Sequence, residues 1–166
     1  SSDVCSSDLG GYVRSNRLPG EGARPMRWYL DGGRSRTARS VNDGTLRASV
    51  GKAGADPFTV RYDLPSADYF AFWAQPMDDK GLSYTSAPLA APTRLVGYPL
   101  VNLRVKADKP DANVFVYLDQ VSADGKAEVV AFGRLALSHR KTGTAPYKTM
   151  GLPYRSEEHT SELQSH

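Results

Sequence analysis

Two runs of alternating side chains, joined by an Asp-Gly turn, limit what this chain can fold into more than any other feature. The first run is Val114–Val121 (VFVYLDQV) and the second is Glu128–Ser138 (EVVAFGRLALS). Between them, Ser122–Gly125 reads Ser-Ala-Asp-Gly, and Asp-Gly suits the backbone of a tight hairpin turn. We therefore expect two long antiparallel strands that form a hairpin here.

The first of these runs is apolar on both of its faces. Residues two apart in a strand point to the same side, so Val114, Val116 and Leu118 share one face, and Phe115 and Tyr117 share the other. A strand with two apolar faces is typical of a position inside a sandwich. We expect this one to be a central strand that is covered on both sides.

Shorter runs of the same kind occur elsewhere, and helical periodicity is weak throughout. The chain has 15 glycines and 11 prolines among 166 residues, which interrupt any long helix. We expect further strands at Trp28–Leu30, Phe58–Leu64, Leu82–Ser86 and Leu100–Ala107. Residues 10–49, rich in Gly, Arg and Ser, are expected to be partly loop or linker. Many short strands separated by turn residues predict an all-β sandwich.

The two ends of the chain are related through their coding sequence. The string AGATCGGAAGAGCACACGTCTGAACT encodes Arg155–Glu162 and begins the codon of Leu163, and its reverse complement encodes Ser1–Asp8 and begins the codon of Leu9. Selection on a folded protein has no reason to produce such an inverted repeat. We therefore expect residues 1–9 and 155–166 to be artefactual tails, translated from sequencing adapters, and residues 10–154 to be the native domain.

The expected native segment differs from the whole chain in charge and in cysteine content. The chain has 21 basic and 18 acidic residues; without the tails 20 and 13 remain, so the net charge is +7 instead of +3. The single cysteine, Cys5, lies in a tail, so no disulfide is expected. The arginines of residues 14–47 lack interleaved aromatic residues, and we expect no nucleic-acid partner. No apolar run reaches the roughly 20 residues of a membrane span, so no membrane association is expected. Cellular compartment and oligomeric state stay open.

The chain shows two incomplete versions of a catalytic motif. The nucleophile elbow of a serine hydrolase reads Gly-x-Ser-x-Gly, but Ser35 and Ser83 are followed by Thr37 and Thr85 where the second glycine should stand. A triad would also need His139 as its base. Because His139 directly follows a β-prone run, we interpret it as a histidine that hydrogen-bonds at a strand end. We predict no catalytic residue in this chain.

The sequence predicts no metal or cofactor site either. Asp78 and Asp79 form an isolated acidic pair without the ligand spacing of a metal site. The pair Gly32-Gly33 is followed by Arg-rich polar sequence and opens no helix, as a phosphate-binding loop would. We therefore expect no metal and no cofactor.

A cluster of aromatic residues is the strongest candidate for a contact surface. It consists of Tyr69, Phe70, Phe72 and Trp73. These rings could form a ligand platform, which would make the chain a stand-alone carbohydrate- or protein-binding sandwich, or they could pack against the sandwich or a neighbouring domain. Because the two phenylalanines have no polar group, we favour packing. Together with Tyr84 and His139, the cluster makes up the predicted domain-interface residues.

Five segments resemble, in order and spacing, the carboxy-terminal domain of the Xaa-Pro dipeptidyl-peptidase and cocaine-esterase-like serine hydrolases. They are WYLDGG at 28–33, GLSYTSAPL at 81–89, the stretch 96–126, SHRK at 138–141 and GLPY at 151–154. The resemblance implies a jelly-roll-like β-sandwich (galactose-binding-like) with long loops, placed after an α/β-hydrolase core in the same polypeptide. Similar proteins tend to carry an acidic residue and an arginine where this chain has Phe132 and Ala136.

The resemblance also implies a role. In that family the catalytic Ser, Asp and His precede this region, so no residue of this chain inherits their function. What is implied is a non-catalytic domain, inactive by itself, of a hydrolase that cleaves X-Pro peptides or esters through an acyl-serine intermediate. The implied partner is the missing α/β-hydrolase catalytic domain of the same polypeptide, on which this domain would pack.

Overall fold

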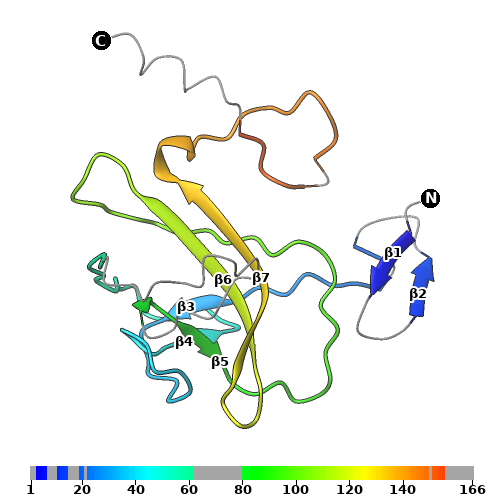
Figure 1. Cartoon of the computed structure of the whole chain (residues 1–166), viewed down its shortest axis with the longest axis horizontal. Helices are drawn as coiled ribbons and strands as arrows, with labels where there is room; N and C mark the ends of the chain where they lie inside the picture. The colour runs from blue at the N-terminus through cyan, green and yellow to red at the C-terminus, as the bar shows by residue number, and fades with distance from the viewer. Residues whose placement is uncertain are drawn as a thin grey trace, which may run out of the picture. The chain divides into compact units, whose positions relative to one another are not determined.

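The computed structural model describes residues 3–6, 11–14, 19–20, 22–61, 80–149 and 151–155. Within these ranges the chain forms seven β-strands and a single turn of 3-10 helix (Figure 1). The chain divides into two units, one of residues 1–25, 94–114 and 134–166 and the other of residues 26–93 and 115–133. The prediction of an all-β protein is confirmed at the level of fold class.

A three-stranded sheet holds β3 (Tyr29–Asp31), β4 (Gly44–Arg47) and β5 (Tyr84–Ser86), in that order. Strands β3 and β4 are antiparallel, whereas β4 and β5 are parallel, with Gly44 opposite Tyr84. A parallel pair needs a long connection, which residues 48–83 supply here. The strands expected around 28–30 and 82–86 are thus confirmed, each with slightly different ends.

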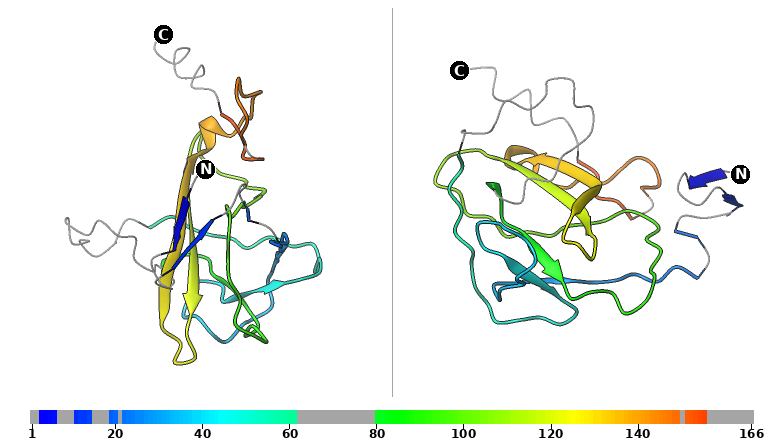
Figure 2. Two further views of the ribbon diagram at one scale, coloured as in Figure 1. Left: turned by 90° about the vertical axis from the view of Figure 1, so that its right-hand side faces the viewer. Right: turned by 60° about the horizontal axis from the view of Figure 1, so that its bottom comes forward.

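The longest strands are β6 (Asn113–Val121) and β7 (Ala127–Ala136), which lie side by side as a hairpin in every view (Figures 1 and 2). Gly125 has a φ of 82°, a left-handed conformation that glycine adopts without a steric penalty. Its N–H donates to the carbonyl of Ser122 over 2.9 Å, and the N–H of Ser122 donates to the carbonyl of Lys126 over 3.0 Å. The hairpin with its Asp-Gly turn is therefore confirmed.

Strands β1 (Asp3–Ser6) and β2 (Gly11–Arg14) form a short antiparallel pair, with Asp3 opposite Arg14. Strand β1 lies within residues 1–9, the stretch expected to be an artefactual tail, and β2 lies within the expected native domain.

Two of the expected strands are absent from the part of the chain that the structure describes. Residues 100–107 run without regular structure, and all of them are exposed. Residues 58–61 are likewise irregular, and residues 62–64 of that expected strand lie outside the described residues. Alternation of apolar and polar residues predicts which face of a strand would be buried. A strand also needs a neighbouring strand that pairs with its backbone N–H and C=O groups. In the described part of the chain neither segment has such a neighbour.

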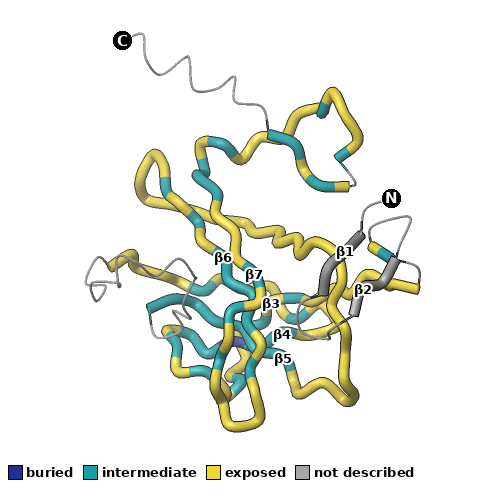
Figure 3. Tube along the Cα trace, turned by 45° about the vertical axis from the view of Figure 1, so that its right-hand side comes forward, coloured by how far each residue is buried: buried dark blue, intermediate teal, exposed yellow. Residues whose placement is uncertain are grey.

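The expectation that Val114–Val121 is covered on both sides is also wrong. Strand β6 pairs with β7 alone in a two-stranded sheet, and the side chain of Phe115 is 57% exposed. Gly44 is the only buried residue in the ranges 19–20, 22–61, 80–149 and 151–155, and no apolar side chain in these ranges is buried (Figure 3). The described strands thus have their backbone pairing but lack the dry core that a sandwich needs.

Candidate functional site

The first candidate nucleophile, Ser35, has a structural role. Its hydroxyl donates to Oδ1 of Asp43 over 2.6 Å, and the N–H of Arg36 donates to the other carboxylate oxygen over 3.0 Å. These bonds, led by that of Ser35, lower the pKa of Asp43. Arg36 and Asp43 have φ angles of 59° and 49°, so this carboxylate closes a loop that contains two left-handed residues. The carboxylate that accepts the Ser35 hydroxyl has a lowered pKa and is therefore too weak a base to activate a serine near neutral pH.

The second candidate, Ser83, lies at the start of the parallel pairing between β4 and β5. Its N–H donates to Oδ1 of Asn42 over 2.9 Å, and its carbonyl accepts the N–H of Gly44 over 2.9 Å. Its hydroxyl is buried and has no hydrogen-bond partner among the described residues. A serine nucleophile needs a base within hydrogen-bond reach, and the structure gives Ser83 none in this part of the chain.

Tyr84, a predicted interface residue, is held from two sides. Its hydroxyl donates to Oδ2 of Asp56 over 2.6 Å, and its ring lies against Gly44, at which a Cβ atom would come within 2.5 Å of Cδ1 of the ring. Burial, together with the hydrogen bond to Asp56 and its negative charge, raises the pKa of Tyr84 above its ordinary value of 10.0. The neutral phenol of Tyr84 therefore ties the loop that contains Asp56 to β5.

His139 lies in the 3-10 turn η2 (Leu137–His139), which directly follows β7. Its Nδ1 is 3.4 Å from Oγ of Ser138. Oδ1 of Asp111 accepts the N–H of Ser138 over 2.9 Å and that of Ala112 over 2.8 Å. A hydrogen bond from the side chain of Ser138 is the largest cause of a lowered pKa of Asp111, and the backbone hydrogen bonds from Ala112 and Ser138 lower it further.

The three side chains Asp111, Ser138 and His139 therefore include the residue types of a catalytic triad but not its order. In a triad the histidine lies between the serine and the acid. Here the acid contacts the serine, and the N–H of Leu137 donates to the carbonyl of Ala112 over 2.8 Å. In this geometry the carboxylate of Asp111 accepts a backbone N–H in the first turn of η2, which is a structural role.

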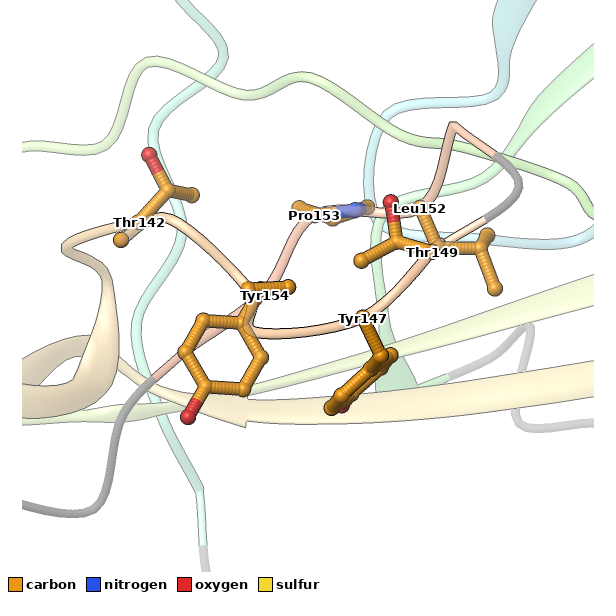
Figure 4. Close-up of a pocket in the computed structure, with 8 residues that line it drawn as sticks. Thr142, Tyr147, Thr149, Leu152, Pro153 and Tyr154 are labelled. Carbon is orange, nitrogen blue, oxygen red and sulfur yellow. The ribbon is translucent and has the colours of Figure 1, made fainter.

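Residues between Thr142 and Tyr154 line a pocket of about 440 Å³ that is open to solvent (Figure 4). The rings of Tyr147 and Tyr154 meet edge to face at 5.8 Å, and the N–H of Gly143 donates to the carbonyl of Tyr154 over 3.0 Å. The lining residues are Thr142, Gly143, Ala145, Tyr147, Thr149, Leu152, Pro153 and Tyr154. Because tyrosine is the only ionisable type among them, the cavity offers no acid or base suited to neutral pH.

Over residues 22–61 and 80–149, as in the shorter described pieces, no three His, Cys, Asp or Glu side chains come together as metal ligands. No helix in the described ranges is long and apolar enough to cross a membrane. The aromatic cluster Tyr69–Trp73 and the acidic pair Asp78-Asp79 lie outside the described residues.

Comparison with known families decides what kind of domain this is. The family of the X-Pro dipeptidyl-peptidase C-terminal non-catalytic domain matches residues 6–158. The chain belongs to this family. The expected resemblance and the expected non-catalytic role are therefore confirmed, and the catalytic domain of a larger hydrolase is implied as the partner of this C-terminal domain.

Two curated mycobacterial proteins are similar to this C-terminal domain. One is named Putative serine esterase Mb1866c, from Mycobacterium bovis, and the other Putative serine esterase MT1883, from Mycobacterium tuberculosis. Each is 37% identical over 81 residues, which are 48% of this chain and 13% of the relative. The chain thus spans about an eighth of the length of these relatives. No solved structure matches it.

The sequence predicts Tyr84 as an interface residue but gives no indication of its hydrogen bond to Asp56. Asp56 stands 28 residues before Tyr84 and shares no motif with it. The parallel register of β4 and β5 brings Tyr84 opposite Gly44, and a pairing between strands so far apart in sequence leaves no local signal.

Proposed function

We propose that this C-terminal domain packs, as a jelly-roll-like β-sandwich, on the catalytic domain of a serine hydrolase that acts on esters or X-Pro peptides, and that it helps to wall the substrate cleft. The observation that carries the proposal is the match of residues 6–158 to a non-catalytic domain of such hydrolases. The serine esterase names of the mycobacterial relatives support the reaction class. The bonding of Ser35 and Ser83 is consistent with a domain that supplies no nucleophile.

In this proposal the chemistry belongs to the catalytic domain. Its serine would attack the carbonyl carbon of the substrate and expel the alcohol of an ester or the amine of an X-Pro peptide, which leaves an acyl-serine. Water would then hydrolyse the acyl-serine ester, which releases the acid and restores the serine. The C-terminal domain would act by excluding water and by holding the cleft in shape. Tyr84, His139 and the aromatic cluster Tyr69–Trp73 are the interface residues we propose for this contact.

The domain boundaries are part of the proposal. We propose that residues 10–154 are native and that 1–9 and 155–166 are translated adapters, on the strength of the inverted repeat in the coding strings. Reading the genomic DNA upstream of codon 10 tests this. An open frame that continues upstream with a Gly-x-Ser-x-Gly elbow would support both the tail and the hydrolase, whereas a genomic sequence that encodes Ser1–Leu9 would overturn the tail.

Activity measurements test the catalytic assignment. The chain should not hydrolyse a p-nitrophenyl ester or an X-Pro p-nitroanilide, whereas the intact hydrolase should cleave one of them. In the intact hydrolase, Ser83→Ala and Ser35→Ala should leave kcat unchanged, because Ser83 has no base within reach among the described residues and Ser35 donates only to the weakly basic carboxylate of Asp43. Turnover by the chain alone that Ser83→Ala abolishes would contradict the proposal.

A further inference from the structure

The β6–β7 hairpin has two unequal faces. Along β6 the side chains of Val114, Val116 and Leu118 are partly buried, whereas Phe115 between them is 57% exposed. Along β7 the same alternation leaves Val130 53% and Phe132 63% exposed. One face is therefore partly covered and the other is open.

The open face is continuous across the two strands. The rings of Tyr117 and Phe132 stack with centroids 6.3 Å apart and an interplanar angle of 23°. Residues two apart share a face, so Phe115 lies on the side of Tyr117, and Val130 lies on the side of Phe132. These four residues, Phe115, Tyr117, Val130 and Phe132, are called the aromatic face below.

The composition of this face is the reverse of what a face exposed to water would carry. An antiparallel sheet with one wet side alternates apolar residues inward with polar residues outward. Here both sides are apolar, and the more exposed side carries the aromatic rings. By the same spacing the face also carries three charged residues, which are Asp119, two residues after Tyr117, Glu128, two residues before Val130, and Arg134, two residues after Phe132. An apolar, aromatic centre with a charged rim is the pattern of a protein interface.

The partner that best fits this face is one tethered to it. The aligned part of the mycobacterial relatives is 13% of their length, so most of each polypeptide lies outside this domain. A domain on the same polypeptide is present at a high effective concentration and occupies an apolar face ahead of any free partner. Interfaces between domains of one chain bury about 600–1,500 Å², and four such side chains are enough to form the apolar centre of an interface of this size.

We infer that the aromatic face of the β6–β7 hairpin is the surface on which the catalytic domain of the same hydrolase docks. The inference rests on the proposed function and names the residues that carry the contact. Phe132 and Phe115 enter apolar depressions of the catalytic domain, and the stacked pair Tyr117–Phe132 keeps the rings in one orientation before docking. Pre-ordered rings lose little conformational entropy when they bind.

Photocrosslinking in the intact hydrolase tests this contact. The photoreactive analogue p-benzoylphenylalanine is placed at position 132, and a matched control has it at position 58, where Phe58 is 46% exposed and lies outside the hairpin. After irradiation, digestion and mass spectrometry, position 132 should give crosslinks to peptides of the catalytic domain, in several-fold excess over position 58. Each variant must first retain the turnover of the unmodified hydrolase, and position 115 replaces 132 if that variant fails to fold.

Every other outcome overturns the inference. Crosslinks from position 132 that stay within the C-terminal domain would mean that its own segments cover the face. Crosslinked dimers would mean a second copy, and no crosslink would mean that the face is open to water. None of these results bears on whether the isolated chain lacks turnover, so the docking surface can fail while the proposed function stands.

Discussion

Replacing Gly44 by alanine tests the packing of the Tyr84 ring against the backbone of β4. The added Cβ would lie 2.5 Å from Cδ1 and 2.8 Å from Cε1 of Tyr84, and 3.0 Å from Nδ2 of Asn42. Carbon atoms in contact lie about 3.5–4.0 Å apart, so the ring must retreat by about 1 Å. It is not free to do so, because its hydroxyl is bonded to Asp56 over 2.6 Å. Overpacking of this kind costs about 1–3 kcal/mol of unfolding free energy.

The matched control is Gly133→Ala in β7. No atom lies within 4 Å of a Cβ at Gly133, and its φ is not left-handed, so alanine there should be neutral or stabilise the strand by up to about 1 kcal/mol. In urea unfolding followed by circular dichroism, the midpoint urea concentration should therefore be lower for Gly44→Ala than for the unmodified protein, but not for Gly133→Ala. In a Tyr84→Ala background the penalty of Gly44→Ala should disappear, because its cause has been removed. Equal midpoints for the two glycine variants would refute the packing argument.

Three further predictions concern single side chains. The raised pKa of Tyr84 means that its contribution to stability is complete below pH 10 and is lost as the pH rises further; Tyr84→Phe should flatten stability measured by urea unfolding between pH 9 and about 11. The lowered pKa of Asp111 means that its contribution is present above its ordinary value of 3.8 and is lost as the pH falls below it; Asp111→Ala should lower the protection factor of the Ser138 amide against hydrogen exchange at neutral pH, and acid should lower the same protection factor in the unmodified protein. Gly125→Ala should cost about 1 kcal/mol in urea unfolding, because the φ of 82° is unfavourable for alanine, whereas Gly54→Ala, with open space around it and no left-handed φ, should cost nothing.

The hairpin was predictable because its signals are local. Asp124-Gly125 specifies the turn, and the alternation on each side of it specifies two strands whose pairing follows from the turn alone. The carboxylate of Asp124 accepts hydrogen bonds from the hydroxyl of Ser122 and from the N–H of Lys126, so even the side chains of the turn act within five residues. The candidate serines were also readable, because the missing second glycine of the elbow motif is a local feature.

Residues 100–107 show where local signals fail. Val101, Leu103 and Val105 alternate with polar residues as a strand would, yet all three are exposed in an irregular segment. Whether such a segment becomes a strand depends on a pairing partner, and the alternation contains no information on that partner. The same reason hid the contact between Tyr84 and Asp56, which depends on the parallel register of β4 with β5.

The sequence and the structure of β6 disagree in a way that points outward. Its pattern, apolar on both sides, is that of a strand covered twice, whereas the described residues cover one side only in part and leave Phe115 exposed. Exposed phenylalanine rings on a sheet favour association, and side chains selected for water would carry charge there. The two observations agree if the second cover is supplied by the catalytic domain that membership of this family implies. In that case β6 still pairs with β7 alone, and the catalytic domain supplies the cover that its second face lacks within this domain.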